Sequence, residues 1–371
     1  MKKVTIMALH LGFGGIEKYI SSLCKMLEDT YEIEIISTYK VLDKPAFNFS
    51  DKIKITYLIN DKPYPTEMKE SFKKYKIFLC IKYFFKNLYI LIKKNKLNIK
   101  AVKNINSDII ITTRDFHNML VGKYADPRII KIATEHNFHN NDERYINNLI
   151  GSLKGFNYFI VVSKELEEFY TKKIGNTRCV YIPNVIDCIY DNPKYNCNSN
   201  LVTVGRLSKE KGYSDLIDVI SIIKKNNRDI HLDIIGDGVE KENLQLKVET
   251  LNLSKNITFH GFKEGIEKEK IILNDSLYVM TSYTESFGIV LIEAMSYGLP
   301  CVAFDSASGA KQVIPQEHLL IGNRDKEKMA KIIIELLNNE NELFKIGKEN
   351  YECSKQYLAS NIKNEWFKIM K

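Results

Sequence analysis

Short hydrophobic runs alternate with longer segments of mixed polarity along most of the chain. Six runs in the first half have the length and composition of buried strands: 4–9, 32–36, 54–58, 108–112, 129–133 and 158–162. Five more follow in the second half: 200–204, 232–235, 257–262, 277–280 and 302–304. Segments with helical spacing, such as 16–27 and 213–223, lie between them. Strands that alternate with helices predict parallel, doubly wound sheets, and therefore an α/β protein.

A polar, turn-rich stretch separates the two alternating halves. Residues 182–200 include Pro193 and several Asn, which is typical of a linker. We therefore expect one domain over 1–185 and a second over 186–356. The chain of 371 residues is long enough to give each domain its own hydrophobic core.

One segment interrupts this alternation and carries most of the net charge. Residues 62–103 hold twelve Lys and two Glu, whereas the whole chain has a net charge of +8. Within it, residues 67–96 predict an amphipathic helix. Its apolar positions recur at helical spacing: Ile77, Ile81, Phe84, Leu88 and Leu91. Aromatic residues stand among the lysines of the opposite face: Phe72, Tyr75, Tyr83 and Tyr89. This combination favours contact with an anionic membrane surface. A packed helix with a solvated lysine face is the alternative, and nucleic acid is disfavoured because no recognition motif accompanies the charge.

The sequence excludes several other classes of protein. No hydrophobic run approaches the length of about 18 residues that a membrane span needs, and the N-terminus begins with a strand-like run instead of a signal peptide. We expect a cytoplasmic protein. The seven Cys occur singly, without a Cys-x-x-Cys pair, so neither disulfides nor a zinc cluster is expected.

The clearest candidate chemistry lies in residues 284–300. Glu285 follows the run at 277–280, and Glu293 lies eight residues later, which predicts two carboxylates on one face of a helix that begins near Glu285. The first N–H groups of a helix have no partner inside it and suit a diphosphate or a sugar hydroxyl. These groups belong to Ser286, Phe287, Gly288 and Ile289. A plain amphipathic helix with a capping residue is the alternative.

Glycine-rich turns with charged neighbours follow three other strands. Arg206 and Lys211 flank the turn at 205–212, so both cations can converge on one anion, although a solvated charged loop is the alternative. The later strands end at turns with Gly236, Gly238 and Phe262.

In the first half, Gly14 and Gly15 open a helix with phosphate-loop geometry, or form a simple turn. His136 lies at a strand end, where ligands bind in open sheets, or serves a structural role.

Several of these motifs, in this order, resemble the retaining GT-B glycosyltransferases of family 4. They are Gly-Gly-x-Glu at 14–17, Gly-Arg-Leu-x-x-x-Lys-Gly at 205–212, and Glu-x7-Glu with a downstream Gly-x-Pro at 285–300. The resemblance implies two Rossmann-like domains that face an interdomain cleft, with a C-terminal helix at 357–371 that crosses back to the N-terminal domain. It also implies transfer of a hexose or N-acetylhexosamine from a nucleotide sugar, most often UDP-linked, to a glycan or lipid-linked acceptor in cell-surface polysaccharide synthesis.

The resemblance also implies roles for single residues. Arg206 and Lys211 would stabilise the departing diphosphate, Glu285 and His136 would face the transferred sugar, and Glu293 would hold the ribose. The donor would be bordered by Gly15, Gly236, Gly238, Phe262, Ser286, Phe287, Gly288 and Ile289. Gly14 and Glu17 would lie on the acceptor side. The sequence at 308–310, Ser-Gly-Ala, departs from the Gly-Gly and Glu of many relatives, which indicates a change in the donor-sugar contacts.

Neither a metal nor another cofactor is expected, because cationic side chains can neutralise the diphosphate and no Asp-x-Asp arrangement is present. With its basic helix, the protein is expected at the inner face of the cell membrane. Two other classes stay open: a sugar-nucleotide epimerase of the same fold, and a non-catalytic module that binds nucleotide sugars.

Overall fold

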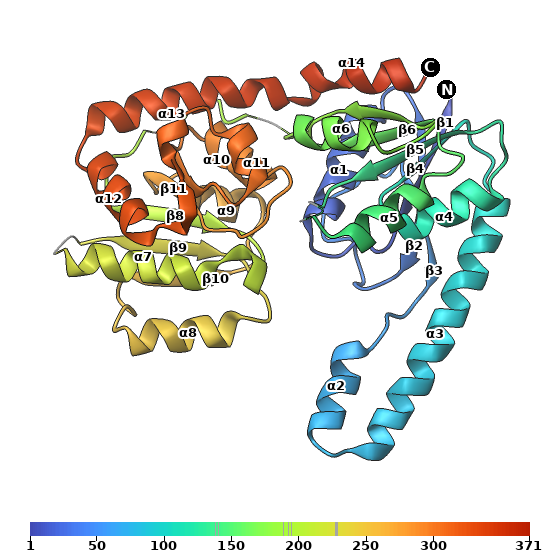
Figure 1. The fold of residues 1–371 in the computed structure, drawn as a ribbon, viewed down its shortest axis with the longest axis horizontal. Helices are drawn as coiled ribbons and strands as arrows, with labels where there is room; N and C mark the ends of the chain where they lie inside the picture. Colours follow the sequence, from blue (N-terminus) through green and yellow to red (C-terminus); the bar gives the residue numbers. More distant parts are fainter. Residues whose placement is uncertain (138, 140, 188, 192, 194, 227–228) are drawn as a thin grey trace. The chain divides into compact units, whose positions relative to one another are not determined.

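The computed structural model describes residues 1–371 except 138, 140, 188, 192, 194 and 227–228. The chain divides into two compact units. Unit 1 comprises Met1–Ile182 and Lys363–Lys371, and unit 2 comprises Pro183–Ile362. Each unit contains one parallel sheet with helices packed against it (Figure 1). The predicted pair of parallel, doubly wound sheets is thereby confirmed.

The sheet of unit 1 has seven parallel strands in the order β3-β2-β1-β4-β5-β6-β7. The strands are β1 (Lys3–Ala8), β2 (Glu32–Tyr39), β3 (Lys54–Ile59), β4 (Ile109–Thr112), β5 (Ile130–Glu135), β6 (Tyr158–Val161) and β7 (Arg178–Tyr181). The helices around it are α1 (Gly15–Leu27), α4 (Asp115–Tyr124), α5 (Glu143–Ser152) and α6 (Lys164–Thr171). The sequence analysis missed β7, an edge strand without a fully buried residue, although residues 179–182 form a short apolar run.

Two further helices of unit 1 form a hairpin that projects from the sheet, drawn in blue and cyan (Figure 1). They are α2 (Pro65–Lys73) and α3 (Ile77–Lys103). The prediction of one helix over 67–96 is therefore wrong. The break falls at residues 74–76, where Tyr75 adopts a left-handed backbone with φ 54°. The inner side of α3 contacts the sheet through Ile90, which packs with Tyr39 and Ile59.

The sheet of unit 2 has six parallel strands in the order β10-β9-β8-β11-β12-β13. The strands are β8 (Asn200–Val204), β9 (His231–Ile235), β10 (Ile257–Gly261), β11 (Leu277–Met280), β12 (Cys301–Phe304) and β13 (Leu320–Ile321). The α-helices of unit 2 are α7 (Tyr213–Lys225), α8 (Lys241–Thr250), α9 (Gly265–Ile272), α10 (Ile289–Ser296), α11 (Ser308–Val313), α12 (Lys326–Leu337) and α13 (Glu340–Ser354). The last helix, α14 (Ala359–Ile369), begins in unit 2 and belongs to unit 1 from Lys363 onward. Short 3-10 helices are η1 (Lys209–Lys211), η2 (Glu317–Leu319), η3 (Gly322–Arg324) and η4 (Lys355–Tyr357).

Burial explains why the strands of both sheets read as continuous hydrophobic runs. All four residues of β4, β11 and β12 are buried, as expected for central strands covered by helices on both faces. Among the helices in the described part of the chain, none combines the length and the apolar composition that crossing a bilayer requires.

A buried carboxyl group at the start of β11 makes the stability of unit 2 depend on pH. Asp275 is fully buried, and both burial and the nearby charge of Asp233 raise its pKa to about 9. Between about pH 4 and pH 9 the folded state therefore retains a proton that the unfolded chain releases, so this group lowers stability as the pH rises. At pH 7 the cost is roughly 4 kcal/mol.

We expect Asp275→Asn to raise the free energy of unfolding at pH 8, and the gain to vanish near pH 4. Urea unfolding across this pH range measures the difference. The exposed Asp29→Asn serves as the control, and an unchanged pH slope in Asp275→Asn would contradict the assignment of a neutral carboxyl group.

Candidate functional site

The loops after β8 and β11, two adjacent strands of unit 2, bring a predicted cation and a predicted acid together. Lys211 ends η1, and its Nζ lies 2.5 Å from Oε2 of Glu285. Arg206, at the start of the same loop as Lys211, is exposed. These groups lie beyond the carboxyl ends of parallel strands, where open α/β sheets bind ligands. The ion pair therefore forms one side of an accessible polar site.

The two loops are held together by backbone contacts. Gly212 has φ 67°, and a Cβ atom there would lie 2.0 Å from the carbonyl oxygen of Thr281. The backbone N–H of Tyr283 donates to the carbonyl of Glu210 at 2.8 Å, and Thr281 Oγ1 donates to the carbonyl of Lys211 at 3.3 Å. Only glycine permits this approach, so Gly212 fixes the position of Lys211 relative to the loop of Glu285.

We expect Gly212→Ala to destabilise unit 2 by at least about 2 kcal/mol, because it adds a backbone clash to the cost of a left-handed residue. The matched control is Gly265→Ala, which has φ 56° but no atom within 4 Å of the added Cβ. Chemical unfolding of both variants measures the difference. Equal losses of stability would contradict the proposed contact with Thr281.

The sequence did not reveal a third element of this site, the side chain of Arg324 in η3. Its guanidinium donates to the carbonyls of Thr281 and Ser282 at 2.8 and 3.1 Å, and its Nη2 lies 2.5 Å from Asp215 Oδ2. Burial opposes the ionisation of Asp215, but hydrogen bonds from Arg324, Lys326 and Tyr283 lower its pKa to about 2. Arg324 thus fixes the chain segment that leads to Glu285. An isolated arginine far along the chain carries no sequence signal for this role.

The glycines predicted near the donor phosphates are required for packing between loops. A Cβ atom on Gly236 would lie 1.9 Å from the carbonyl oxygen of Gly205, and one on Gly238 would lie 2.3 Å from that of Leu207. Both glycines therefore let the loop after β9 support the loop that carries Arg206. Phe262, which follows β10, is half exposed.

The second predicted acid belongs to α10 and has a partner that the sequence did not reveal. Glu293 Oε2 lies 2.9 Å from Nζ of Lys268 on α9, and both side chains are mostly buried. Because Gly288 adopts φ 81°, α10 begins only at Ile289. The prediction that Glu285 and Glu293 lie on one helical face is therefore wrong: Glu285 lies in the preceding loop.

Between Glu285 and α10, two predicted donor-binding residues point into the core of unit 2. Ser286 and Phe287 are both buried, and the ring of Phe287 contacts that of Tyr357 at 5.6 Å. A Cβ atom on Gly309 would lie 2.5 Å from the backbone nitrogen of Phe287, so α11 packs directly on this segment. A ligand at this position would therefore meet the backbone and not the ring of Phe287.

The remaining predicted residues lie in unit 1. Gly14 is the N-cap of α1, and Gly15 is its exposed first residue. Glu17 is buried beside a histidine and an arginine, with Oε1 3.4 Å from Nδ1 of His10 and 3.9 Å from Nη2 of Arg114. His10 and Arg114, which sequence reasoning missed, follow β1 and β4. Their position just beyond two neighbouring strands is the signal that could have identified them.

His136 lies just beyond β5, next to the strand that precedes Arg114. Its Nε2 lies 3.1 Å from Thr134 Oγ1, and its ring centre lies 4.0 Å from that of Tyr19 on α1. The backbone N–H of His136 donates to the buried Glu135 carboxyl group, whose pKa is raised by burial. These contacts hold the imidazole of His136 against α1.

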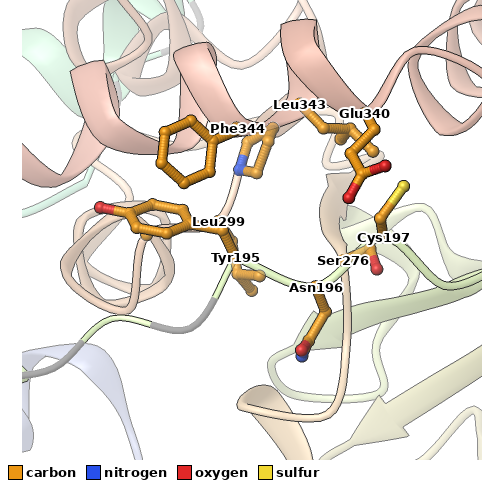
Figure 2. A pocket seen from close by; sticks show the side chains of 10 residues that line it. Tyr195, Asn196, Cys197, Ser276, Leu299, Glu340, Leu343 and Phe344 are labelled. Atoms are coloured by element: carbon orange, nitrogen blue, oxygen red, sulfur yellow. The ribbon is translucent and has the colours of Figure 1, made fainter.

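Figure 2 shows a cavity in unit 2 that contains none of the predicted site residues. It is lined by Tyr195, Asn196, Cys197, Ser276, Gly298, Leu299, Pro300, Glu340, Leu343 and Phe344. Its volume of about 30 Å³ is that of roughly one water molecule. This cavity is too small for a nucleotide sugar. Among the described residues, no three His, Cys, Asp or Glu side chains are arranged as ligands for a metal ion.

Comparison with known proteins finds glycosyltransferases among the relatives of this chain. Residues 191–352 match the family model of glycosyl transferases group 1. An uncharacterized glycosyltransferase of Haemophilus influenzae is 25% identical over 380 residues, which cover all of both chains. A Campylobacter jejuni protein named GalNAc-alpha-(1->4)-GalNAc-alpha-(1->3)-diNAcBac-PP-undecaprenol alpha-1,4-N-acetyl-D-galactosaminyltransferase is 23% identical over 385 residues, covering 100% of this chain and 98% of its own length.

Solved structures support the same assignment at the level of the fold. A mutant of S. aureus TarM in complex with fondaparinux, alpha-GlcNAc-glycerol and UDP superimposes with a TM-score of 0.80. The match covers 100% of both chains at 17% sequence identity. The predicted GT-B fold and the predicted enzyme class are both confirmed: the chain is a glycosyltransferase whose residues 191–352 match the group 1 family model.

Proposed function

We propose that this glycosyltransferase moves a hexose or N-acetylhexosamine from a UDP-sugar to a glycan or lipid-linked acceptor, with retention at the sugar carbon, in cell-surface polysaccharide synthesis. The observation that carries the proposal is the ion pair of Lys211 and Glu285 beside Arg206. It supplies both signs of charge that glycosyl transfer needs, within the region that matches the family model.

In the proposed reaction, the bond between the sugar carbon and the diphosphate breaks while the acceptor oxygen bonds to the same face of that carbon. The acceptor's proton leaves toward the departing phosphate oxygen. Negative charge on the diphosphate would be stabilised by Arg206 and Lys211, which preorganised loops hold in place. Glu285 would favour the positive charge that develops on the sugar, and Glu293 would hold the ribose.

The relatives support the choice of substrates. The related TarM structure contains UDP, and the Campylobacter relative is named for an acceptor linked to undecaprenol through a diphosphate. A lipid-linked acceptor requires access to a membrane surface. The lysine-rich hairpin of α2 and α3 supports a peripheral position on the inner face of the cell membrane.

The test is UDP release from a panel of UDP-sugars, with and without lipid-linked acceptors, combined with NMR of the product anomer. We expect one sugar to be used, release to rise with acceptor, and the α configuration of the donor to be kept. Turnover of the sugar nucleotide that yields an isomer without an acceptor would identify an epimerase. Binding without turnover would identify a non-catalytic module.

We also propose that transfer needs no metal ion, because two cationic side chains can neutralise the diphosphate. Addition of EDTA, followed by assay of UDP release, is expected to leave the rate unchanged. A rate that falls with EDTA and recovers with Mg²⁺ or Mn²⁺ would contradict this proposal.

A further inference from the structure

The hairpin of α2 and α3 exposes an unusual amount of apolar surface. Of the 21 large hydrophobic side chains exposed on the described residues, twelve lie between positions 72 and 92. Phe78 and Tyr75 are each 90% exposed, and Ile77 is 67% exposed. Contiguous exposed apolar surface of this kind marks a site of interaction. The face that the sequence pattern identified as apolar is therefore an open surface, and not a packing face.

Apart from Leu79, the large apolar residues that α3 exposes form one continuous arc around the helix. At 3.6 residues per turn, they span about 160° of its circumference. The arc contains Ile77, Phe78, Ile81, Phe84, Phe85, Leu88, Tyr89, Leu91 and Ile92. Buried Ile90 lies on the side that contacts the sheet. Tyr83, grouped by the sequence pattern with the exposed aromatics, instead stacks on Tyr64, with ring centres 5.7 Å apart.

Lysines border this arc and set the chemistry of its partner. Lys82 and Lys93 follow its edge around the helix, and the Nζ of Lys93 lies 5.6 Å from the ring centre of Tyr89. Residues 71–104 contain ten Lys and neither Asp nor Glu. A second copy of the chain would bring like charges together at such a surface. An anionic lipid bilayer offers acyl chains for the apolar arc and phosphates for the lysines.

We propose that the hairpin docks by inserting its apolar arc below the headgroups of an anionic bilayer, with the lysines extended to the phosphates. The inference deepens the proposed function, on which it rests, because it names the surface through which the enzyme reaches a lipid-linked acceptor. Insertion of the apolar arc differs from adsorption of the protein through charge alone. Insertion of aromatic side chains places part of the binding energy in contacts that salt does not screen.

Vesicle flotation of the full chain tests the docking. We expect wild-type protein to bind vesicles of phosphatidylcholine with phosphatidylglycerol and to remain partly bound at about 1 M salt. The double change Phe78→Ser with Phe85→Ser is expected to weaken binding about tenfold or more. The matched control changes two exposed apolar residues of unit 2, Leu246→Ser with Ile266→Ser, and is expected to bind as wild type.

Fluorescence measures insertion directly. The chain has a single tryptophan, Trp366, which is 1% exposed, so a tryptophan introduced by Phe78→Trp adds a separate signal. Lipids with brominated acyl chains are expected to quench the new signal and leave that of Trp366 unchanged. Vesicle binding without this quenching, and fully lost in high salt, would overturn the insertion.

Two further readouts separate the alternatives. Failure to bind vesicles, together with a concentration-dependent dimer that the Phe78 and Phe85 changes abolish, would overturn the lipid assignment in favour of a second copy. UDP release is measured on the same preparations. Turnover without vesicle binding would overturn only the docking, whereas vesicle binding without turnover of any UDP-sugar would overturn the proposed function and leave the docking intact.

Discussion

Replacement of Lys211 by methionine is expected to lower kcat for sugar transfer about 10²–10³-fold, the usual effect of removing one preorganised group that stabilises charge in the transition state. Methionine keeps much of the length and apolar stem of the lysine, so the packing of the loop beside Gly212 should survive. The rate is measured as UDP release at saturating donor. Thermal unfolding of the same variant shows whether unit 2 remains folded.

The matched control for this prediction is Lys209→Met. Lys209 belongs to the same 3-10 helix as Lys211 but is exposed, and no ion pair joins it to Glu285. We expect less than about a twofold change in kcat, in line with an ordinary surface substitution. Equal losses in both variants would mean that the net charge of the loop matters, and not the position of the Lys211 ammonium group.

The change Glu285→Gln is expected to move binding and turnover in opposite directions. Lys211 is paired with Glu285, so a bound diphosphate must compete with the carboxylate for the ammonium group. Removal of the negative charge should strengthen UDP binding severalfold, because like charges repel at this distance. It should also lower kcat about 10²-fold, since the carboxylate no longer favours positive charge on the sugar.

Calorimetric titration measures the affinity for UDP, and steady-state kinetics measure kcat. Glu264→Gln is the control, because Glu264 is an exposed acid at the start of α9 and its substitution changes the net charge of unit 2 equally. A variant of Glu285 that loses UDP affinity would show that the carboxylate supports nucleotide binding. That result would contradict the competition between Glu285 and the diphosphate.

The sequence predicted the sheets well because central parallel strands are hydrophobic on both faces. The predicted bounds of β8 and β11 agree with the structure at both ends, and the motif that contains Lys211 begins immediately after β8. The pairing of Lys211 with Glu285 follows from the order of strands in a parallel sheet, since the loops after neighbouring strands meet at one edge.

Other features depended on tertiary contacts that no local pattern encodes. A helical period in α3 predicted an apolar face, but the same period describes a buried face and an exposed one. The left-handed residue Gly288 delayed the start of α10 and removed Glu285 from the helix. Arg324 and Lys268 reach the site from segments remote in sequence, so their partners could be identified only from the folded chain.

On this proposal, one nucleotide sugar binds in unit 2 at the loop that carries Arg206 and Lys211 and at α10, which carries Glu293. A crystal structure of the chain with UDP is the test. We expect the diphosphate within hydrogen-bond distance of Arg206 and Lys211, with the ribose hydroxyls at Glu293 and the Lys211–Glu285 contact lengthened. UDP bound away from these side chains, or a diphosphate that leaves the Lys211–Glu285 pair intact and touches neither cation, would contradict it.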